Sequence, residues 1–393
     1  MGNFVIRYSL FVILNSTEVA GIYIHIPFCK KRCNYCDFFS STDTGLKEEL
    51  IAAIVTEADL RKMYLENETV ETIYIGGGTP SLLSPDDLNR ILDSLFSVFI
   101  IAGNAEITLE ANPDDLSVTY LKQLKQTPVN RLSIGVQSFN DEGLQIMGRR
   151  HNSRQAVDSV KLSRDTGFNN ISIDLIYGLP GQTVPMWEKN LDMAFKMEID
   201  HLSAYLLAYE PDTVIYKLMK QGKIQKTGQE ESYEMFELLV NKAEDAGFIH
   251  YEISNFGKQG CFSKHNTNYW LQKKYLGLGP SAHSYNTDSR QWNITDNLKY
   301  IRSVEKGIVD SEYEKLDEIN IFNEYIMLSL RTMWGCDLNF MREKFGEQET
   351  MGCLSGISKY INSGKAYTDN NKIYLTTQGK FISNRIISDL FIA

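Results

Sequence analysis

The chain has little of what marks nucleic-acid-binding, membrane-spanning or disulfide-rich proteins. Its 40 Lys and Arg are outnumbered by 50 Asp and Glu, and no run of five basic residues occurs, so a phosphate-binding surface is not indicated. No apolar stretch reaches the about 20 residues of a membrane span, because Arg7 interrupts the apolar start of the chain. Six cysteines in 393 residues do not form the disulfide framework of a short secreted domain. We therefore expect a cytoplasmic globular protein with reduced thiols.

The length permits two domains, because 393 residues can bury more than one core. Residues 1–19 precede the first core strand, and we treat them as an N-terminal extension; a signal peptide that ends near Ala20 is the alternative. We expect a large domain over residues 20–310 and a small C-terminal domain over residues 311–393.

Short apolar strands alternate with amphipathic helical segments through the first 250 residues. Six βα units in succession predict a parallel sheet with right-handed crossovers. The predicted strands are Ile22–Ile26, Thr72–Ile75, Glu106–Leu109, Arg131–Val136, Ile171–Ile176 and His201–Leu207. The predicted helices are Leu46–Leu65, Pro85–Phe99, Leu116–Gln126, Asp141–Met147, Arg154–Thr166, Pro185–Lys196 and Glu230–Ala246.

Polar residues near the strand ends favour one of two arrangements of this sheet. Glu110, Gln137 and Asp174 lie at or just past the carboxyl ends of predicted strands, as do the cysteine loop and the Gly76–Thr79 loop. An open doubly wound sheet fits the alternation too, but chemistry drawn from several strands is typical of a barrel. We predict an α/β fold, a TIM-like partial (β/α)6 barrel. Helical segments around a strand pair at Ala366–Leu375 indicate a small helix-rich C-terminal domain.

Three cysteines lie within eight residues, directly after the first strand: Cys29, Cys33 and Cys36. Thiolates bind soft metals and iron–sulfur clusters. Three thiolates hold three irons of a [4Fe–4S] cubane and leave the fourth iron open to another ligand. Zinc is the alternative, with His25 as its fourth ligand, but His25 falls within the strand and the compact spacing is unusual for zinc. The spacing favours the cluster.

The cysteine segment also resembles a known family. Cys29–Cys36 after a strand is similar to the radical SAM superfamily. The flanking segments Tyr23–Cys29 and Tyr35–Phe38 resemble the branch that contains oxygen-independent coproporphyrinogen III dehydrogenase (HemN) and the heme chaperone family HemW. The resemblance runs from Gly21 to the C-terminus. It implies a partial (β/α)6 barrel, and a cluster that binds S-adenosylmethionine (SAM) and can cleave it, with one electron, to methionine and a 5′-deoxyadenosyl radical.

Several strand-end residues are candidates for contact with SAM. The glycines of Gly76–Ser81 let the backbone approach a ligand, although a tight βα turn has the same composition. The resemblance implies that Gly77, Gly78 and Thr79 hold the amino group of SAM. Glu110 suits an ammonium or hydroxyl donor, with a surface acid or helix cap as the alternative.

Three further side chains complete this candidate set. Gln137 offers an amide to a ligand or is a satisfied buried amide. Arg149 offers a fork for the SAM carboxylate, or interacts with the dipole of a helix end. Asp174 lies within a strand, where an unpaired acid is costly, and suits ribose hydroxyls. The resemblance matches Glu110, Gln137, Arg149 and Asp174 to SAM-contacting positions of the branch and adds Tyr23.

Two features separate the members of this branch. The dehydrogenase pattern continues Cys-x-x-Cys-x-Cys, but Phe38 occupies the last position here. The segment His265–Trp270 combines an imidazole with aromatic rings, which suits heme ligation and packing, although the residues alone favour a core cluster around a hydrogen-bonded histidine. The pattern His-Asn-x-x-Tyr-Trp resembles the motif of the HemW family, which implies a heme-related role for His265.

The resemblance therefore implies a heme chaperone that carries a [4Fe–4S] cluster and SAM, binds heme and passes it to respiratory cytochromes. The alternative is a SAM-dependent coproporphyrinogen III dehydrogenase, so whether the chain is an enzyme stays open, and no catalytic residue is assigned. The expected partners are heme, cytochromes and an electron donor, without nucleic acid or a membrane span; peripheral membrane contact stays open. The C-terminal domain is expected to cover the barrel mouth or to contact the recipient.

Overall fold

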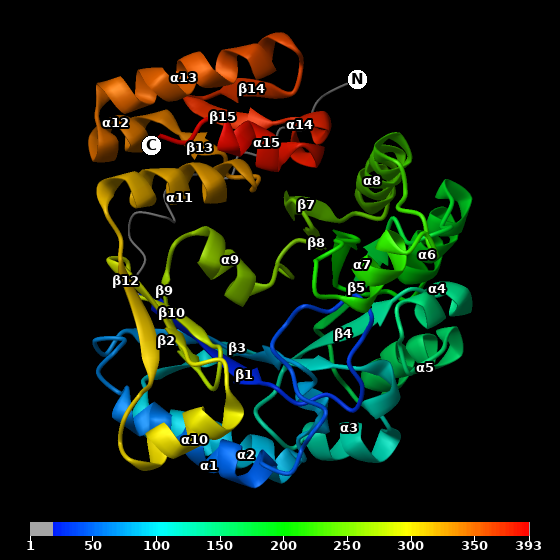
Figure 1. Cartoon of the computed structure of the whole chain (residues 1–393), viewed down its shortest axis with the longest axis vertical. Helices are drawn as coiled ribbons and strands as arrows, with labels where there is room; N and C mark the ends of the chain where they lie inside the picture. Colours follow the sequence, from blue (N-terminus) through cyan, green and yellow to red (C-terminus); the bar gives the residue numbers. More distant parts are fainter. Residues whose placement is uncertain (1–18, 393) are drawn as a thin grey trace.

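The computed structural model describes residues 19–392, which contain one large sheet and one small one. Six parallel strands pair in chain order at the centre of the large sheet (Figure 1). They are β1 (Val19–Ile26), β2 (Thr69–Gly77), β3 (Ile101–Ala111), β4 (Arg131–Gln137), β5 (Ile171–Tyr177) and β6 (His201–Leu206). All six predicted strands are confirmed, although β3 begins at Ile101 rather than at Glu106.

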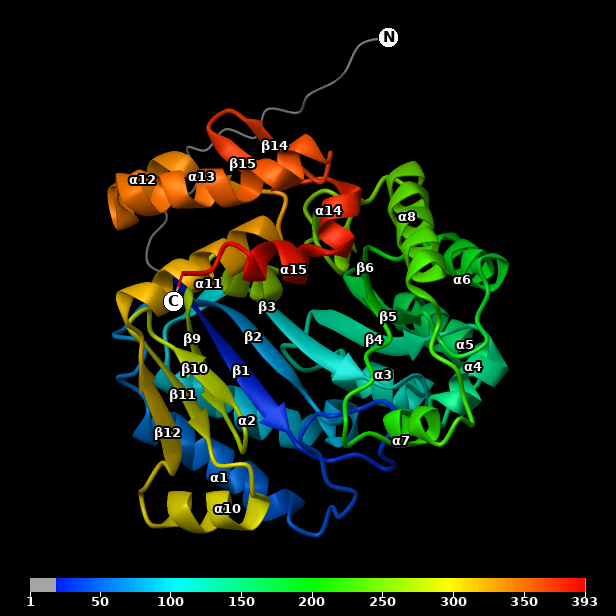
Figure 2. The same cartoon turned by 45° about the horizontal axis from the view of Figure 1, so that its top comes forward.

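The helices between these strands lie on the outer face of the sheet (Figures 1 and 2). Their starts follow local capping chemistry. At one, Ser84 and Asp87 form a reciprocal capping box before a helix with Pro85 in its first turn; at another, Asn152 and Gln155 do the same. The helices are α1 (Lys47–Leu60), α2 (Pro85–Val98), α3 (Val118–Leu124), α4 (Asp141–Ile146), α5 (Ser153–Asp165) and α6 (Val184–Lys196), and α7 (Val214–Lys220) and α8 (Gln229–Asp245) follow β6.

Side chains alternate across each central strand, and the alternation forms two layers. On β1, Ile22, Ile24 and Ile26 are fully buried in the main hydrophobic core, which they share with the helices. Tyr23 and His25 point the other way, into the barrel interior, where Tyr23 lies near the ring of Tyr74. The parallel sheet with its outer helices is therefore the predicted partial (β/α)6 barrel.

Short strands that the sequence did not predict extend both edges of the sheet. β9 (Lys274–Leu278) runs parallel to β1 and continues into an antiparallel meander of β10 (His283–Tyr285), β11 (Ser289–Asn293) and β12 (Ser311–Lys315). β8 (Asn255–Gly257) and β7 (Ile249–Glu252) follow β6 at the other edge. Because β12 pairs with β11, the large sheet continues past residue 310. α10 (Asn297–Glu305) packs on α1, and α9 (Lys264–Trp270) contacts β1 and β2.

The C-terminal helices have a hydrophobic core of their own. This part contains α11 (Glu318–Leu330), β13 (Cys336–Asp337), α12 (Leu338–Phe345), α13 (Glu347–Asn362), β14 (Ala366–Asp369), β15 (Lys372–Leu375), α14 (Thr377–Phe381) and α15 (Ser383–Ser388). It packs on the side of β7, α8 and α9, away from the arrowheads of the parallel strands (Figure 2). There the Met333 N–H donates to the Tyr251 carbonyl at 2.9 Å, and the Arg331 guanidinium lies 5.7 Å from the Trp270 ring. Of the two roles expected for this domain, the structure does not support a cover over the barrel mouth, and contact with the recipient stays a prediction.

Most of the predicted N-terminal extension, residues 1–18, lies outside the described residues. Between residues 19 and 392, no helix is both long and apolar enough to span a bilayer.

Candidate cofactor site

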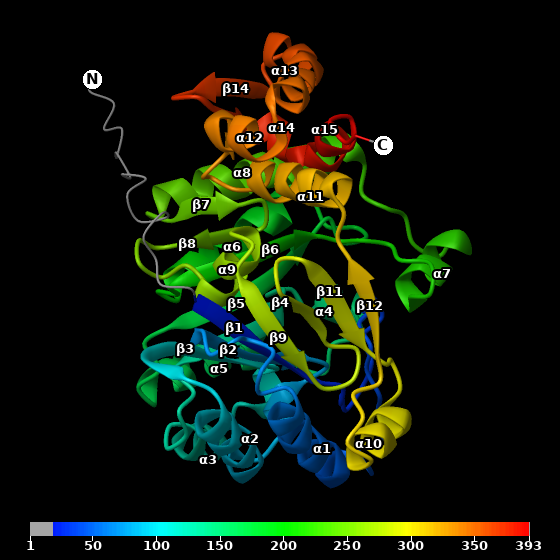
Figure 3. The same ribbon diagram turned by 90° about the vertical axis from the view of Figure 1, so that its left-hand side faces the viewer.

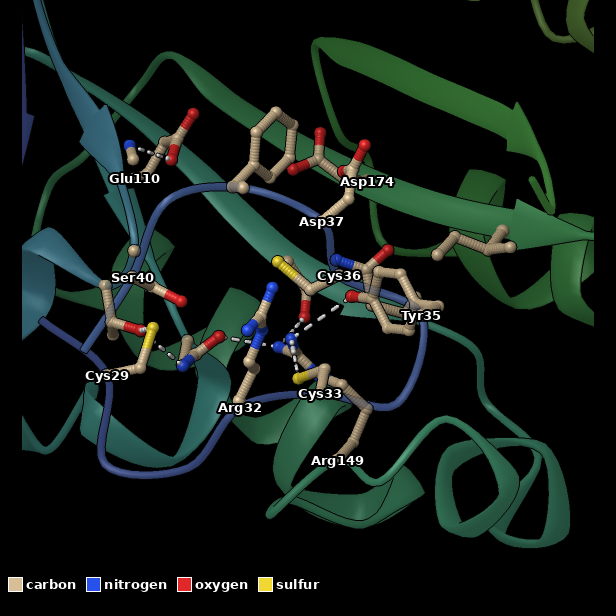
Figure 4. Close-up of a pocket in the computed structure, with 18 of the residues that line it drawn as sticks. Cys29, Arg32, Cys33, Tyr35, Cys36, Asp37, Ser40, Glu110, Arg149 and Asp174 are labelled. Atoms are coloured by element: carbon tan, nitrogen blue, oxygen red, sulfur yellow. Dashed lines mark hydrogen bonds between the residues drawn. The ribbon is translucent and has the colours of Figure 1, made fainter. Parts of the chain in front are cut away.

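A pocket of about 460 Å³, here called the cofactor pocket, lies at the carboxyl ends of the parallel strands. The cysteine loop forms one side, and Glu110 and Asp174 lie across from it (Figure 4). Loops or strand ends after all six parallel strands contribute to its walls. Ten of the twelve predicted site residues line it: Cys29, Cys33, Cys36, Gly77, Gly78, Thr79, Glu110, Gln137, Arg149 and Asp174.

The cysteine loop is held in place by backbone hydrogen bonds. The Cys29 N–H donates to Ser41 O at 2.9 Å, and the Asn34 N–H donates to Met147 O at 2.9 Å. Burial is the main reason that the pKa of Cys29 is raised and that of Cys36 rises to about 11, and the neighbouring thiols add to both shifts. The three sulfurs line a common space. Burial makes the thiolate form of Cys29 and Cys36 unfavourable without a positive partner, which iron would supply.

The geometry does not favour the zinc alternative. His25, its proposed fourth ligand, is 5% exposed and outside the cofactor pocket. Its Nε2 bonds Phe39 O at 3.0 Å, and its Nδ1 bonds the Tyr23 hydroxyl at 3.1 Å. Within residues 19–392 no three His, Cys, Asp or Glu side chains converge as a single ion requires. A cubane carries its irons at separate corners, so three spaced thiols fit it better.

Arg149 joins the cysteine loop to the strand ends. Its Nη2 donates to Asn112 Oδ1 at 2.6 Å and to Gly135 O at 2.7 Å. Its Nη1 lies 3.5 Å from Cys33 Sγ. Its Nε is buried without a hydrogen-bond partner among the described residues. A buried guanidinium donor that lacks an acceptor suits a ligand carboxylate.

Glu110 and Asp174 bring two buried carboxyl groups to the opposite wall. Burial, the largest cause, raises the pKa of Glu110 to about 7 and that of Asp174 to about 6. Tyr74 donates to Glu110 Oε1 at 2.8 Å, and the Gly77 N–H donates to Oε2 at 3.2 Å. Desolvated acids of this kind favour a ligand with positive charge or several donors, which matches the ammonium, sulfonium and hydroxyl groups of SAM.

The backbone of the glycine loop approaches the cysteines closely. A Cβ on Gly78 would lie 2.7 Å from Phe28 O and 3.0 Å from Cys29 Sγ, and Gly77 has a φ of +110°. Only glycine fits both positions. The φ of Gln137 is +67°, which is strained for a residue with a side chain. Strain of this kind at the end of β4, inside the pocket, is typical of a functional position.

Tyr23 and His265 do not line the cofactor pocket. His265 is 2% exposed inside the barrel, stacked on Tyr74 with ring centroids 5.1 Å apart. Its Nδ1 bonds Thr72 Oγ1 and its Nε2 bonds the Tyr269 hydroxyl, each at 2.8 Å. Iron ligation by His265 would break one of these bonds and leave a buried hydroxyl unpaired, at about 1–3 kcal/mol.

The sequence reasoning missed several residues of the cofactor pocket. Asn112 lies between Arg149 and Thr79, to which it donates at 3.4 Å, and Tyr35 bonds Arg149. Apolar Phe38, Tyr205 and Leu206 also line the pocket, with exposed fractions of 65%, 43% and 40%. The position of Asn112 just after a strand was an available signal; the exposed aromatic residues gave none.

Comparisons with known proteins agree with this geometry. A sequence profile of the radical SAM superfamily matches residues 23–194. The heme chaperone HemW of Bacillus subtilis is 37% identical over 93% of this chain and 97% of its own length, and that of Lactococcus lactis is 35% identical over 93% and 95%.

The fold also has a solved counterpart. The Escherichia coli coproporphyrinogen III oxidase HemN, a radical SAM enzyme, superposes with a TM-score of 0.82 over 97% of this chain and 92% of that protein. At 22% identity this likeness shows the fold alone. Radical SAM proteins hold a [4Fe–4S] cluster and SAM, which the cofactor pocket fits. Because the chain is 37% identical to the Bacillus subtilis HemW over 93% of its own length, it belongs to the HemW family of the radical SAM superfamily.

Proposed function

We propose that this protein is a heme chaperone of the cytoplasm, which carries a [4Fe–4S] cluster and SAM, binds heme and transfers it to respiratory cytochromes. The observation that carries the proposal is 37% identity to a heme chaperone over 93% of the chain. The cofactor pocket supports it, because ten of the residues inferred for cluster and SAM line one space.

Within the pocket each residue has a proposed task. Cys29, Cys33 and Cys36 ligate three irons of the cluster. The loop Gly77–Thr79 and Glu110 receive the amino group of SAM, and Arg149 receives its carboxylate through the unpaired Nε. When bound, the reduced cluster supplies the electron that cleaves SAM.

The proposed contacts with the ribose and with a further polar group of SAM come from the strand ends. Asp174, which accepts from Ser133 Oγ at 3.5 Å, receives the ribose hydroxyls, and the amide of Gln137 bonds a polar group of SAM. Tyr23 reaches the pocket only indirectly, through His25 and the backbone of Phe39. It therefore supports the cysteine loop rather than contacting SAM in this conformation.

Phe38 argues against the alternative, a coproporphyrinogen III dehydrogenase. It stands where the dehydrogenase pattern has a cysteine, and it is 65% exposed at the rim of the pocket. The position is thus free for a large apolar residue and contributes no fourth thiol beside the cluster.

One preparation decides between the two functions. The full chain is reconstituted with iron and sulfide without oxygen, then divided between a hemin titration and an assay with coproporphyrinogen III, SAM and a reductant. We expect saturable hemin binding and no protoporphyrinogen. Robust conversion of coproporphyrinogen III would overturn the chaperone function in favour of the enzyme.

A further inference from the structure

A second cavity lies between the β9–β11 edge of the barrel and the C-terminal helix α11. We call it the α11 cavity; its volume is about 310 Å³. Figures 1 and 3 show α11 across the ends of β9, β11 and β12. Among the described residues, none lines both this cavity and the cofactor pocket. The two are separate sites.

The walls of the α11 cavity are aromatic and largely apolar. Tyr269 and Tyr275 meet edge to face with ring centroids 4.5 Å apart, and Tyr285 continues the row at 6.1 Å from Tyr275. Met327 and Leu328 face these rings from α11. Aromatic faces opposite a flexible thioether suit a planar conjugated ligand, and the volume is in the range of small-molecule sites.

One charged pair interrupts this apolar lining. Arg290 Nε donates to Glu324 Oε1 at 2.8 Å, and Arg290 Nη1 donates to the Tyr275 hydroxyl at 3.4 Å. Within residues 19–392 Arg290 Nη2 makes no hydrogen bond, and Glu324 Oε2 is buried without a partner. A guanidinium that is held through Nε and Nη1 and has the N–H groups of Nη2 left over suits a ligand carboxylate.

Of the His-Asn-x-x-Tyr-Trp motif, Tyr269 lines the α11 cavity and His265 does not. The hydroxyl of Tyr269 bonds His265 Nε2 at 2.8 Å, while the tyrosine itself lines the cavity. His265 is in turn held by Thr72 on β2. The His265 imidazole therefore holds the Tyr269 side chain, which forms one wall of the cavity, without lining the cavity itself.

We propose that the α11 cavity holds one edge of the heme, that Arg290 receives a propionate, and that His265 is a positioning residue for the Tyr269 wall. This site rests on the proposed heme-chaperone function. A cavity of this size covers only part of a tetrapyrrole, so the exposed remainder stays accessible to an acceptor. That arrangement suits a protein that must release what it binds.

The test compares two sizes of side chain at one position. Hemin is titrated against full-length reconstituted protein in which Met327→Trp fills the cavity or Met327→Ala enlarges it, with Met351→Trp on the exposed face of α13 as the control. We expect Met327→Trp to weaken hemin binding at least about tenfold, and the other two variants to stay within about threefold of wild type. Cluster content and thermal unfolding report the fold of each variant.

A modified ligand tests the role of Arg290 without any change to the protein. Hemin dimethyl ester lacks the propionate charges, so it should bind wild type at least about tenfold more weakly than hemin does. Equal affinities for hemin and for its dimethyl ester would exclude Arg290 as the partner of a propionate. If the Met327→Trp variant folds and binds hemin as tightly as the wild type, the α11 cavity is not the heme site, but the chaperone function could still hold. If the wild-type protein binds no hemin, the proposed function itself is overturned.

Discussion

Arg149 Nη1 lies 3.5 Å from the Sγ of Cys33, and this contact places a fixed positive charge beside a predicted cluster thiolate. The same guanidinium bonds Asn112 and the carbonyl of Gly135. One side chain thus connects the loop proposed to hold the cluster to the strand ends proposed to hold SAM.

Two substitutions of Arg149 should separate the contribution of its positive charge to SAM binding from that of its forked hydrogen-bond geometry. Arg149→Lys keeps a cation but loses the fork, and Arg149→Met loses both. Since a hydrogen bond to a charged group contributes about 1.5–3 kcal/mol, we expect SAM affinity to fall roughly 10- to 100-fold in Arg149→Lys and further in Arg149→Met. Equilibrium dialysis with radiolabelled SAM measures it, at matched iron content. Unchanged affinity in Arg149→Met would exclude Arg149 as the carboxylate partner.

Loss of a single pocket thiol should abolish the cluster. We expect Cys33→Ala to retain almost no iron or sulfide after reconstitution and to lose the brown absorbance, because only three thiols face the pocket. Cys261→Ala serves as the matched control, since Cys261 lies outside the cofactor pocket. Iron and sulfide content per chain is the measurement. A full cluster in Cys33→Ala would remove Cys33 from the ligand set.

The raised carboxyl pKa values predict a pH dependence of SAM binding. With the pKa of Glu110 near 7 and that of Asp174 near 6, both groups are largely protonated in the ligand-free protein below about pH 5.5, where they carry no negative charge to attract the positive groups of SAM. Affinity should therefore rise between about pH 5.5 and 7.5 and then level off.

The variant Glu110→Gln cannot ionise at this position. It should bind SAM more weakly than the wild type above about pH 7, and most of the rise in affinity near pH 7 should be absent. Glu305→Gln, at an exposed glutamate of α10, should reproduce the wild-type curve. Isothermal titration at several pH values records both. A wild-type curve that is flat from about pH 5.5 to 7.5 would contradict this assignment.

His265 should matter to stability even without heme. His265→Ala leaves the hydroxyls of Thr72 and Tyr269 unpaired inside the barrel, so we expect a loss of roughly 2–5 kcal/mol in unfolding free energy. Urea unfolding of heme-free protein measures it, and His283→Ala, at an exposed histidine of β10, should change little. A heme-free His265→Ala as stable as wild type, with an altered heme spectrum, would make His265 an iron ligand instead.

The central strands could be predicted because burial on both faces leaves a clear apolar pattern. On β3 the start was placed late, since Gly103 and Asn104 look like a turn in the sequence although they continue the strand. β12 (Ser311–Lys315) could not be predicted, because four of its five residues are exposed and no alternation remains. Its pairing with β11 depends on tertiary contact alone.

The cofactor pocket was predictable because parallel strands bring their carboxyl ends to one edge, so Glu110, Gln137 and Asp174 had to lie close together. The place of His265 was not. The residues alone favoured a packed histidine and the family resemblance favoured a heme-related role, and only the fold shows both ring nitrogens in use. Arg290 and Glu324 were missed because their pairing joins segments far apart in the sequence.

The C-terminal helices pack beside β7, α8 and α9, and no described residue beyond Glu210 lines the cofactor pocket. If the proposed function holds, an electron donor that approaches the cluster at Cys36 would not need to displace α11, and a heme acceptor that docks near α11 would not block that donor. Because the cofactor pocket and the α11 cavity share no lining residue, the proposed electron donor and heme acceptor could be bound at the same time.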